Sequence, residues 1–236
     1  MSDVALTQFK KTLEIAEELL LLEQRYFHNP PRSTEQKAVQ GLRGGVAVFV
    51  VAAFENYLKN LMEEHLSELS FKHKSLSLNK LPDHLQVNRV YRLLDHAMKG
   101  PAFQTAPPKT QRIQDIERAC KIIISGDIDP IVFCDVSSNP NSKNVKSLFS
   151  NVAINDIFIT IKSKFDRKWR SPTAQTFIED KLDEIVNRRH LVAHTADALA
   201  ITRSDLKASI RFLKILATLL DSEMRDHTAK LIKQCT

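Results

Sequence analysis

The sequence is poor in the residues that make tight turns. Only five glycines and nine prolines occur among its 236 residues, and most turns depend on these two residue types. The apolar fraction of 43% and the charged fraction of 26% are ordinary for a globular chain. A globular composition with so few turn formers favours long helices over a β-rich fold. We therefore predict an all-α protein.

Cysteine is also scarce, with three widely spaced residues: Cys120, Cys134 and Cys235. They provide neither metal-ligand spacing nor an even set for disulfide bonds, so we expect the reducing cytoplasm as the location. The N-terminus lacks the basic segment and apolar core of a signal peptide. The longest uncharged apolar run, residues 44–54, is shorter than the ~20 residues of a bilayer span. We expect no membrane contact.

Charge of each sign is concentrated in different parts of the chain. Residues 1–70 carry seven basic and ten acidic residues, a net charge of −3. Residues 140–170 carry seven basic residues against two acidic ones, a net of +5. A local basic stretch suits a polyanion such as nucleic acid, although a solvated helix face has the same composition. Charge alone leaves both interpretations open.

Apolar residues recur at three- and four-residue spacing along most of the chain, which predicts helices. The expected architecture is a bundle with two long early helices, two late helices and shorter inserted ones. Ser171-Pro172 is expected to open the predicted helix 173–194, because proline suits the first helical turn. Thr202 with Asp205 resembles a capping pair at the start of the final predicted helix. Residues 46–54 are apolar on all sides, and we expect burial on all sides. The predicted helices are 4–27, about 34–69, 83–99, 110–125, two within 144–165, 173–194 and 202–234.

The stretch Asn187 to His194, NRRHLVAH, places two arginines and two histidines near the end of a predicted helix. Arg189 follows the apolar Ile185 and Val186 by one turn, so it lies on or beside the core face of that helix. A half-buried guanidinium needs an anionic partner. That partner is either an internal carboxylate, for which Glu55 is a candidate, or a ligand phosphate. The expected core side of this helix comprises Phe177, Leu182, Ile185, Val186 and Ala193.

His190 and His194 are four residues apart and share one helix face. Imidazole, with an unperturbed pKa of about 6.5, suits proton transfer near neutral pH. The glutamate of an HExxH zinc motif is absent, because Leu191 follows His190, so we expect no metal. Two interpretations remain: histidines stabilised by the dipole of a helix C-terminus, or a proton-transferring histidine beside a phosphate-binding arginine. The second is the minimum set for metal-free RNA cleavage, because the RNA 2′-hydroxyl supplies the nucleophile.

Residues 172–225 resemble the C-terminal half of a HEPN domain (higher eukaryotes and prokaryotes nucleotide-binding). The ribonuclease-type HEPN signature is an arginine, a polar residue and a histidine four to six residues beyond the arginine. Arg189, His190 and His194 fit this form. Residues 47–66, AVFVVAAFENYLKNLMEEHL, resemble the second helix of the fold, where an acidic residue, here Glu55, precedes an aromatic region. The resemblance is greatest to the RiboL-PSP-HEPN-like branch.

The resemblance implies a homodimer in which two motif copies face a shared cleft. Arg189 would contact the scissile phosphate, His194 would act as acid or base, and His190 would position the substrate or the arginine. Glu55, Arg188 and Asn187 would support them. The implied activity is a metal-independent, cofactor-free endoribonuclease acting on RNA in prokaryotic defence or a toxin–antitoxin system, with an antitoxin or sensor as a regulatory partner. We interpret residues 1–236 as one domain with 71–140 as a family-specific insertion.

Two alternatives remain beside this hypothesis. A non-catalytic helical dimer could serve as a scaffold for a protein or nucleic acid, with Arg189 as a structural salt bridge to Glu55. A general nucleic-acid binder could instead use the basic stretch of residues 143–170 through phosphate contacts. Trp169, within that stretch, could stack on a base, but an aromatic residue that anchors a loop is the more ordinary role.

Overall fold

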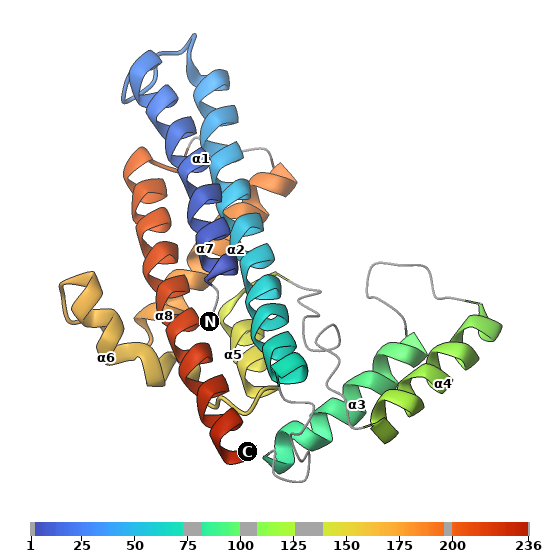
Figure 1. Cartoon of the computed structure of the whole chain (residues 1–236). Helices are drawn as coiled ribbons and strands as arrows, with labels where there is room; N and C mark the ends of the chain where they lie inside the picture. The colour runs from blue at the N-terminus through green and yellow to red at the C-terminus, as the bar shows by residue number, and fades with distance from the viewer. Residues whose placement is uncertain (1–2, 73–81, 100–107, 126–138, 196–199, 236) are drawn as a thin grey trace.

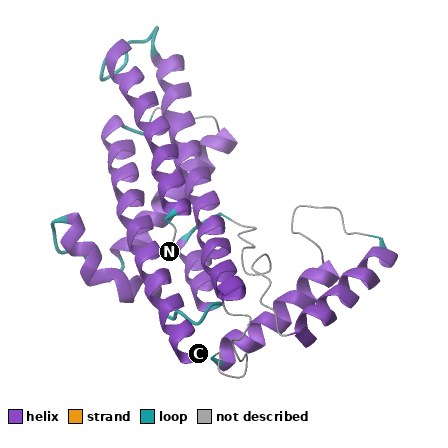
Figure 2. Ribbon diagram, viewed as in Figure 1, coloured by secondary structure: helices purple, strands orange, loops and turns teal. Residues whose placement is uncertain are grey.

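The computed structural model describes residues 3–72, 82–99, 108–125, 139–195 and 200–235. Over these residues the chain forms eight helices and no strand (Figure 2), so the all-α prediction is confirmed. The helices are α1 (Val4–Tyr26), α2 (Gln36–Lys72), α3 (Asp83–Lys99), α4 (Lys109–Ser125), α5 (Ser142–Ser150), α6 (Ile157–Trp169), α7 (Phe177–Thr195) and α8 (Arg203–Cys235).

Three long helices, α1, α2 and α8, lie side by side and form the body of the molecule, with α7 packed against α2 (Figure 1). The aromatic rings of Phe9, Phe54 and Tyr57 meet in the core, with ring centroids 4.9 to 6.0 Å apart. The Tyr57 hydroxyl donates to the carbonyl of Ala217, 2.8 Å away, and joins α2 to α8. Apolar burial and a satisfied polar group therefore act together at the bundle centre.

One end of this bundle contains a buried charge cluster centred on Glu23. Arg43 donates from Nε and Nη2 to Glu23 Oε1, at 3.0 and 2.8 Å, and from Nη1 to the carbonyl of Ile201 at 3.2 Å. Arg203 Nε donates to the other carboxylate oxygen at 2.5 Å. Burial alone would raise the pKa of Glu23, but the hydrogen bonds from both arginines outweigh it and hold the pKa below its ordinary value.

The apolar centre of α2 is buried on one side only, so the prediction of burial on all sides is wrong. Val46, Val50 and Phe54 are buried, whereas Phe49 is half-buried and Ala52 is exposed. By length and composition α2 would also suit a membrane span, with a mean hydropathy of 1.4 over its most apolar window, half of which is buried. The buried half is explained by packing against α1, α7 and α8.

The chain reverses between α6 and α7 through a turn fixed by polar contacts. Lys162 Nζ, nearly buried, donates to Asp166 Oδ2 at 2.6 Å and to the carbonyl of Thr173 at 2.8 Å. The Thr173 hydroxyl donates to Asp166 at 2.7 Å. Thr173 is thereby held against α6, and α7 begins only at Phe177. The prediction that Pro172 opens this helix is wrong for that reason.

The remaining boundaries agree well with the periodicity of the sequence. The predicted capping pair is confirmed: the Thr202 hydroxyl donates to Asp205 Oδ2 at 2.6 Å and accepts from the Asp205 amide at 3.1 Å. Trp169 stacks in an aromatic cluster with Phe165, Phe177 and Phe212, which matches the anchoring role. Ala193 is exposed, so it does not belong to the core side of α7.

Helices α3 and α4 form a hairpin that extends away from the bundle (Figure 1). The two helices contact each other, and Leu93, Ala97 and Ala119 are buried. Outside that contact the hairpin exposes several large apolar side chains: Val87, Tyr91, Met98, Ile113, Ile116 and Ile124. The hairpin falls within residues 71–140, and their interpretation as a family-specific insertion remains a prediction.

Candidate active site

Arg189 lies on α7 near its C-terminal end and is half-buried. Its Nη1 donates to Asn139 Oδ1. Its Nε is buried and has no hydrogen-bond partner. A guanidinium has five N–H donors and no acceptor. The acceptor described for Arg189 is a neutral amide, and a charged acceptor would form a stronger hydrogen bond.

Asn139 is held in place by the first turn of α5. Its carbonyl accepts from the amide of Asn141 at 2.8 Å and from the side chain of Asn144 at 2.7 Å. The Asn141 side chain caps α5 by accepting from the Asn144 amide at 2.9 Å. Ser142 donates through its amide and its hydroxyl to Asp183 of α7, at 2.7 and 2.8 Å. The Asn139 amide is thus fixed relative to α7.

Glu55 of α2 is half-buried and lies within the electrostatic reach of Arg189. Burial raises the pKa of the Glu55 carboxyl, and the positive charge of Arg189 opposes this shift. Within the described parts of the chain, no ion pair or hydrogen bond joins Glu55 to Arg189. The hypothesis of a direct Glu55–Arg189 salt bridge is therefore wrong, although the two side chains influence each other.

His190 and His194 lie together on the solvent side of α7. Their ring centroids are 4.2 Å apart, with the ring planes inclined by 63°, and both side chains are exposed. The predicted shared face is confirmed. Exposed imidazoles are accessible to a ligand as large as a polynucleotide.

The helix does not bring Arg189 and His194 together. The two residues are five positions apart, and at 3.6 residues per turn this corresponds to about 140° around the helix axis. Arg189 lies near α5 and α2, whereas His194 is exposed. One copy of α7 therefore presents the anion-binding group and the proton-transferring group on different sides.

The two supporting residues of the motif have unequal surroundings. Arg188 forms ion pairs with Glu184, one turn earlier on α7, and with Asp205 of α8, 3.4 Å away. It therefore joins the motif helix to the start of α8, which is a structural role. Asn187 is exposed, and no contact of its side chain is described.

An open groove lies between α2 and the C-terminal part of α7, with a volume of about 680 Å³. Its walls are the weakly covered side of α2 and the C-terminal turn of α7. A Cβ atom built on Gly41 or Gly45 meets nothing within 4 Å, so the two glycines leave space along this wall. The lining residues are Lys37, Gln40, Gly41, Gly44, Gly45, Val48, Phe49, Ala52, Val192 and Ala193.

The basic stretch of residues 140–170 is not a continuous cationic face. Lys146 pairs with Glu179, Lys162 with Asp166 and Lys164 with Glu223. Four basic side chains are exposed without a described carboxylate partner: Lys143, Arg167, Lys168 and Arg170. The last three lie close in sequence at the end of α6, and they are the part of this stretch that remains available to a phosphate backbone.

Comparison with known proteins identifies the family. The model of the family described as RiboL-PSP-HEPN matches residues 11–226, which is most of the chain and includes the hairpin and the motif. The protein belongs to the RiboL-PSP-HEPN family, a branch of the HEPN superfamily, and the resemblance in the sequence is confirmed. No curated protein and no solved structure matches the chain.

Family membership supports a nuclease or RNA-related superfamily. Within the described residues no group of three or more His, Cys, Asp or Glu side chains is arranged to hold a metal ion. The sequence did not identify Asn139, the direct partner of Arg189. The Asn139-Pro140-Asn141 segment is typical of a turn before a helix. This local pattern does not indicate that Asn139 contacts Arg189, 50 positions further along the chain.

Proposed function

We propose that the protein is a metal-independent endoribonuclease that works as a homodimer, in the cytoplasm, in a prokaryotic defence or toxin–antitoxin setting. One observation carries the proposal: within the described residues, the half-buried Arg189 donates to a neutral amide and keeps a buried Nε that has no hydrogen-bond partner. A phosphate oxygen would supply the charged acceptor that this guanidinium lacks.

The proposed reaction uses the RNA 2′-hydroxyl as the nucleophile. His194 removes the 2′-hydroxyl proton, and the 2′-oxygen forms a bond to the adjacent phosphorus. The bond from phosphorus to the 5′-oxygen breaks, and a second imidazole protonates that oxygen. Arg189 stabilises the charge that develops on the phosphoryl oxygens, and His190 positions the substrate. The products are a 2′,3′-cyclic phosphate and a 5′-hydroxyl.

A homodimer accounts for the separation of Arg189 and His194 around α7. The second copy offers another His194, which supplies the two imidazoles that the proton transfers need. The groove between α2 and α7 is lined by Val192 and Ala193 of the motif helix and has room along Gly41 and Gly45 for a second helix. The distance between two packed helices depends on the side chains at their contact, and small side chains allow a close approach.

The test is an RNA-cleavage assay in EDTA with product ends mapped. The wild type should leave 2′,3′-cyclic phosphate ends, and His194→Ala and Arg189→Ala should each lose cleavage by on the order of a hundredfold or more. His84→Ala and Arg118→Ala change exposed residues of the hairpin and serve as matched controls. Retained cleavage in both motif variants would falsify the proposal.

The dimer is tested separately with Gly45→Trp. Because a side chain at Gly45 meets open space, the variant should keep its melting temperature while losing dimerisation and cleavage together. A Gly45→Trp protein that remains dimeric and active would place the dimer contact elsewhere.

The scaffold is the second candidate, and the wide angle between Arg189 and His194 within one copy favours it. A scaffold predicts that a folded, dimeric wild type binds a partner or RNA without cleaving it. In that case His194→Ala should change neither binding nor stability.

A further inference from the structure

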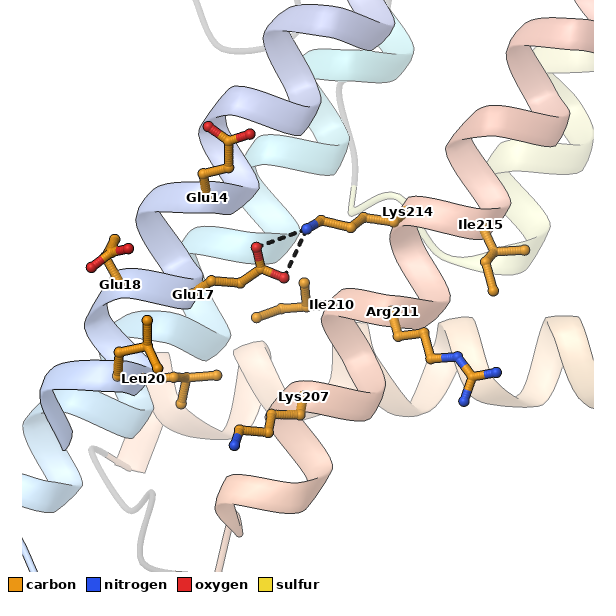
Figure 3. A pocket seen from close by; sticks show the side chains of 10 residues that line it. Glu14, Glu17, Glu18, Leu20, Lys207, Ile210, Arg211, Lys214 and Ile215 are labelled. Carbon is orange, nitrogen blue, oxygen red and sulfur yellow. Dashed lines mark hydrogen bonds and ion pairs between the residues drawn. The ribbon is translucent and has the colours of Figure 1, made fainter. Parts of the chain in front are cut away.

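A second groove runs between α1 and α8, on helices that do not carry the motif (Figure 3). Its volume is about 590 Å³. Carboxylates line the α1 wall, and cations line the α8 wall, as the labelled side chains in the figure show. The lining residues are Glu14, Glu17, Glu18, Leu20, Leu21, Lys207, Ile210, Arg211, Lys214 and Ile215.

The charges of this groove are only partly neutralised within the chain. Lys214 Nζ lies 2.7 and 2.8 Å from the two carboxylate oxygens of Glu17 and is the one ion pair drawn across the groove (Figure 3). Glu14 and Glu18 have no described cationic partner. Among the described residues, Lys207 donates to the neutral side chain of Gln24, at 2.9 Å. Acid on one wall and base on the other therefore remain separated.

Apolar side chains of α1 are exposed beside the charged residues of the groove. Leu21 is 52% exposed and lines the groove, and Ile15 and Leu22 on α1 are 54% and 45% exposed. Exposed apolar groups rimmed by charge mark surfaces that associate with other macromolecules. The groove and the adjoining face of α1 therefore combine exposed apolar groups with charged groups, as protein interfaces do.

The charge of each wall of the groove determines which partner fits it. Helices α1 and α8 are antiparallel, as the pairs Glu23–Arg203 and Glu17–Lys214 demonstrate. If a second copy lies face to face on the groove, a two-fold axis along the groove places α1 of each copy opposite α8 of the other. Each acidic wall then meets a basic wall. An axis across the groove would place acid against acid, which is unfavourable.

We infer that the α1–α8 groove is an interface with a second copy of this chain, formed around a two-fold axis that runs along the groove. A polyanion is excluded by the row of glutamates, and a purely cationic peptide by the lysines and Arg211. A copy of the same surface supplies a wall of each sign, so the interface is self-complementary in charge. No residue of α2 or α7 lines this groove, so the contact is distinct from the motif.

The consequence is an assembly larger than a dimer. One pair forms through the groove beside the motif, as in the proposed function, and a second pair forms through α1 and α8. Two different two-fold contacts on one chain generate a tetramer or a longer array.

The test reverses the charge of one wall at a time. Glu14→Lys/Glu18→Lys makes both walls basic, and Lys207→Glu/Arg211→Glu makes both acidic. Each variant alone should weaken this association by on the order of tenfold to a hundredfold in sedimentation velocity. The two variants mixed in equal amounts should associate again, because each acidic wall then faces a basic wall.

Gly45→Trp serves as the background for the same series, so that only the α1–α8 contact is observed. Circular dichroism and melting temperatures identify any variant that fails to fold, and Lys207→Glu alone is the fallback because Arg211 also stacks over Trp169. A wild type that shows no such association, or a mixture that stays dissociated, overturns the inference. RNA cleavage in the wall variants on the wild-type background should persist, which separates this result from a failure of the proposed function.

Discussion

Two arginines on neighbouring helices of this protein have opposite surroundings. Arg43 of α2 has a side chain that is 4% exposed, and its donors go to the ionised Glu23 and to the carbonyl of Ile201. Arg189 of α7 is half-buried, donates to the neutral Asn139 and has an unpartnered Nε. The donors of Arg43 are satisfied by acceptors within the fold, whereas Arg189 keeps a free donor that an external anion could accept from.

The difference teaches where to look for function in a helical bundle with many charges. A buried ion pair with all donors satisfied fixes packing and has no need of a ligand. A buried donor without an acceptor costs free energy, and a ligand that supplies the acceptor recovers that cost. The predictions below test whether the two arginines differ in this way.

The largest effect is expected from Arg43→Ala. Removal of the guanidinium leaves the Glu23 carboxylate buried without one of its two cations, which typically costs about 3–5 kcal/mol of unfolding free energy. Urea unfolding followed by circular dichroism measures it. Lys99→Ala, which breaks the exposed pair with Asp95, is the control and should change stability by less than ~1 kcal/mol.

Acid should weaken the same cluster. The pKa of Glu23 is lowered in the folded state, so its contribution to stability is present above its ordinary pKa of 4.5 and is lost as pH falls through the folded value. Melting temperature should therefore drop steeply in the acid range below pH 4.5. Glu23→Gln should flatten this part of the profile, and an unchanged profile in the variant would assign the acid sensitivity to other carboxylates.

Arg189→Ala should cost much less stability than Arg43→Ala, about 1 kcal/mol or less, because it also removes a buried unpartnered donor. RNA affinity, measured at fixed salt, should fall although the fold is retained. If the loss of stability equals that of Arg43→Ala, the contrast between the two arginines disappears and the scaffold interpretation gains support.

The smallest effect is expected from Glu55→Gln. Burial raises the pKa of Glu55 in the folded state, so the carboxylate stabilises the fold less as pH rises through that value. At neutral pH the amide variant should melt slightly higher than the wild type, and the two should converge in acid. A lower melting temperature at neutral pH would mean that the Arg189 charge dominates at this carboxylate.

Much of the helical framework follows from local patterns. The predicted helix 83–99 has the observed bounds of α3, and the Thr202–Asp205 pair marks the start of α8 as predicted. Both features depend on residues within a few positions of each other, which sequence displays directly. The helix that contains the motif and the shared face of its histidines were predictable for the same reason.

Contacts between segments far apart in the chain were harder to predict from the sequence. The amide that binds Arg189 lies in the turn before α5, and the late start of α7 depends on Asp166 and Lys162 of α6. The composition of residues 46–54 indicated burial but not which helices would cover them. One side stays open beside α7, and that choice depends on tertiary packing.

The antiparallel pairing of α1 and α8 has a consequence for folding during synthesis. Ion pairs join residues near its two ends, from Asp3 with Arg225 to Glu23 with Arg203. A ribosome releases α1 and α2 before α8, so the apolar surface that these two helices bury against α8 stays uncovered until α8 has left the exit tunnel. Completion of the bundle therefore requires the synthesis of α8, and a nascent chain that stops before α8 should be a target for chaperones and proteases.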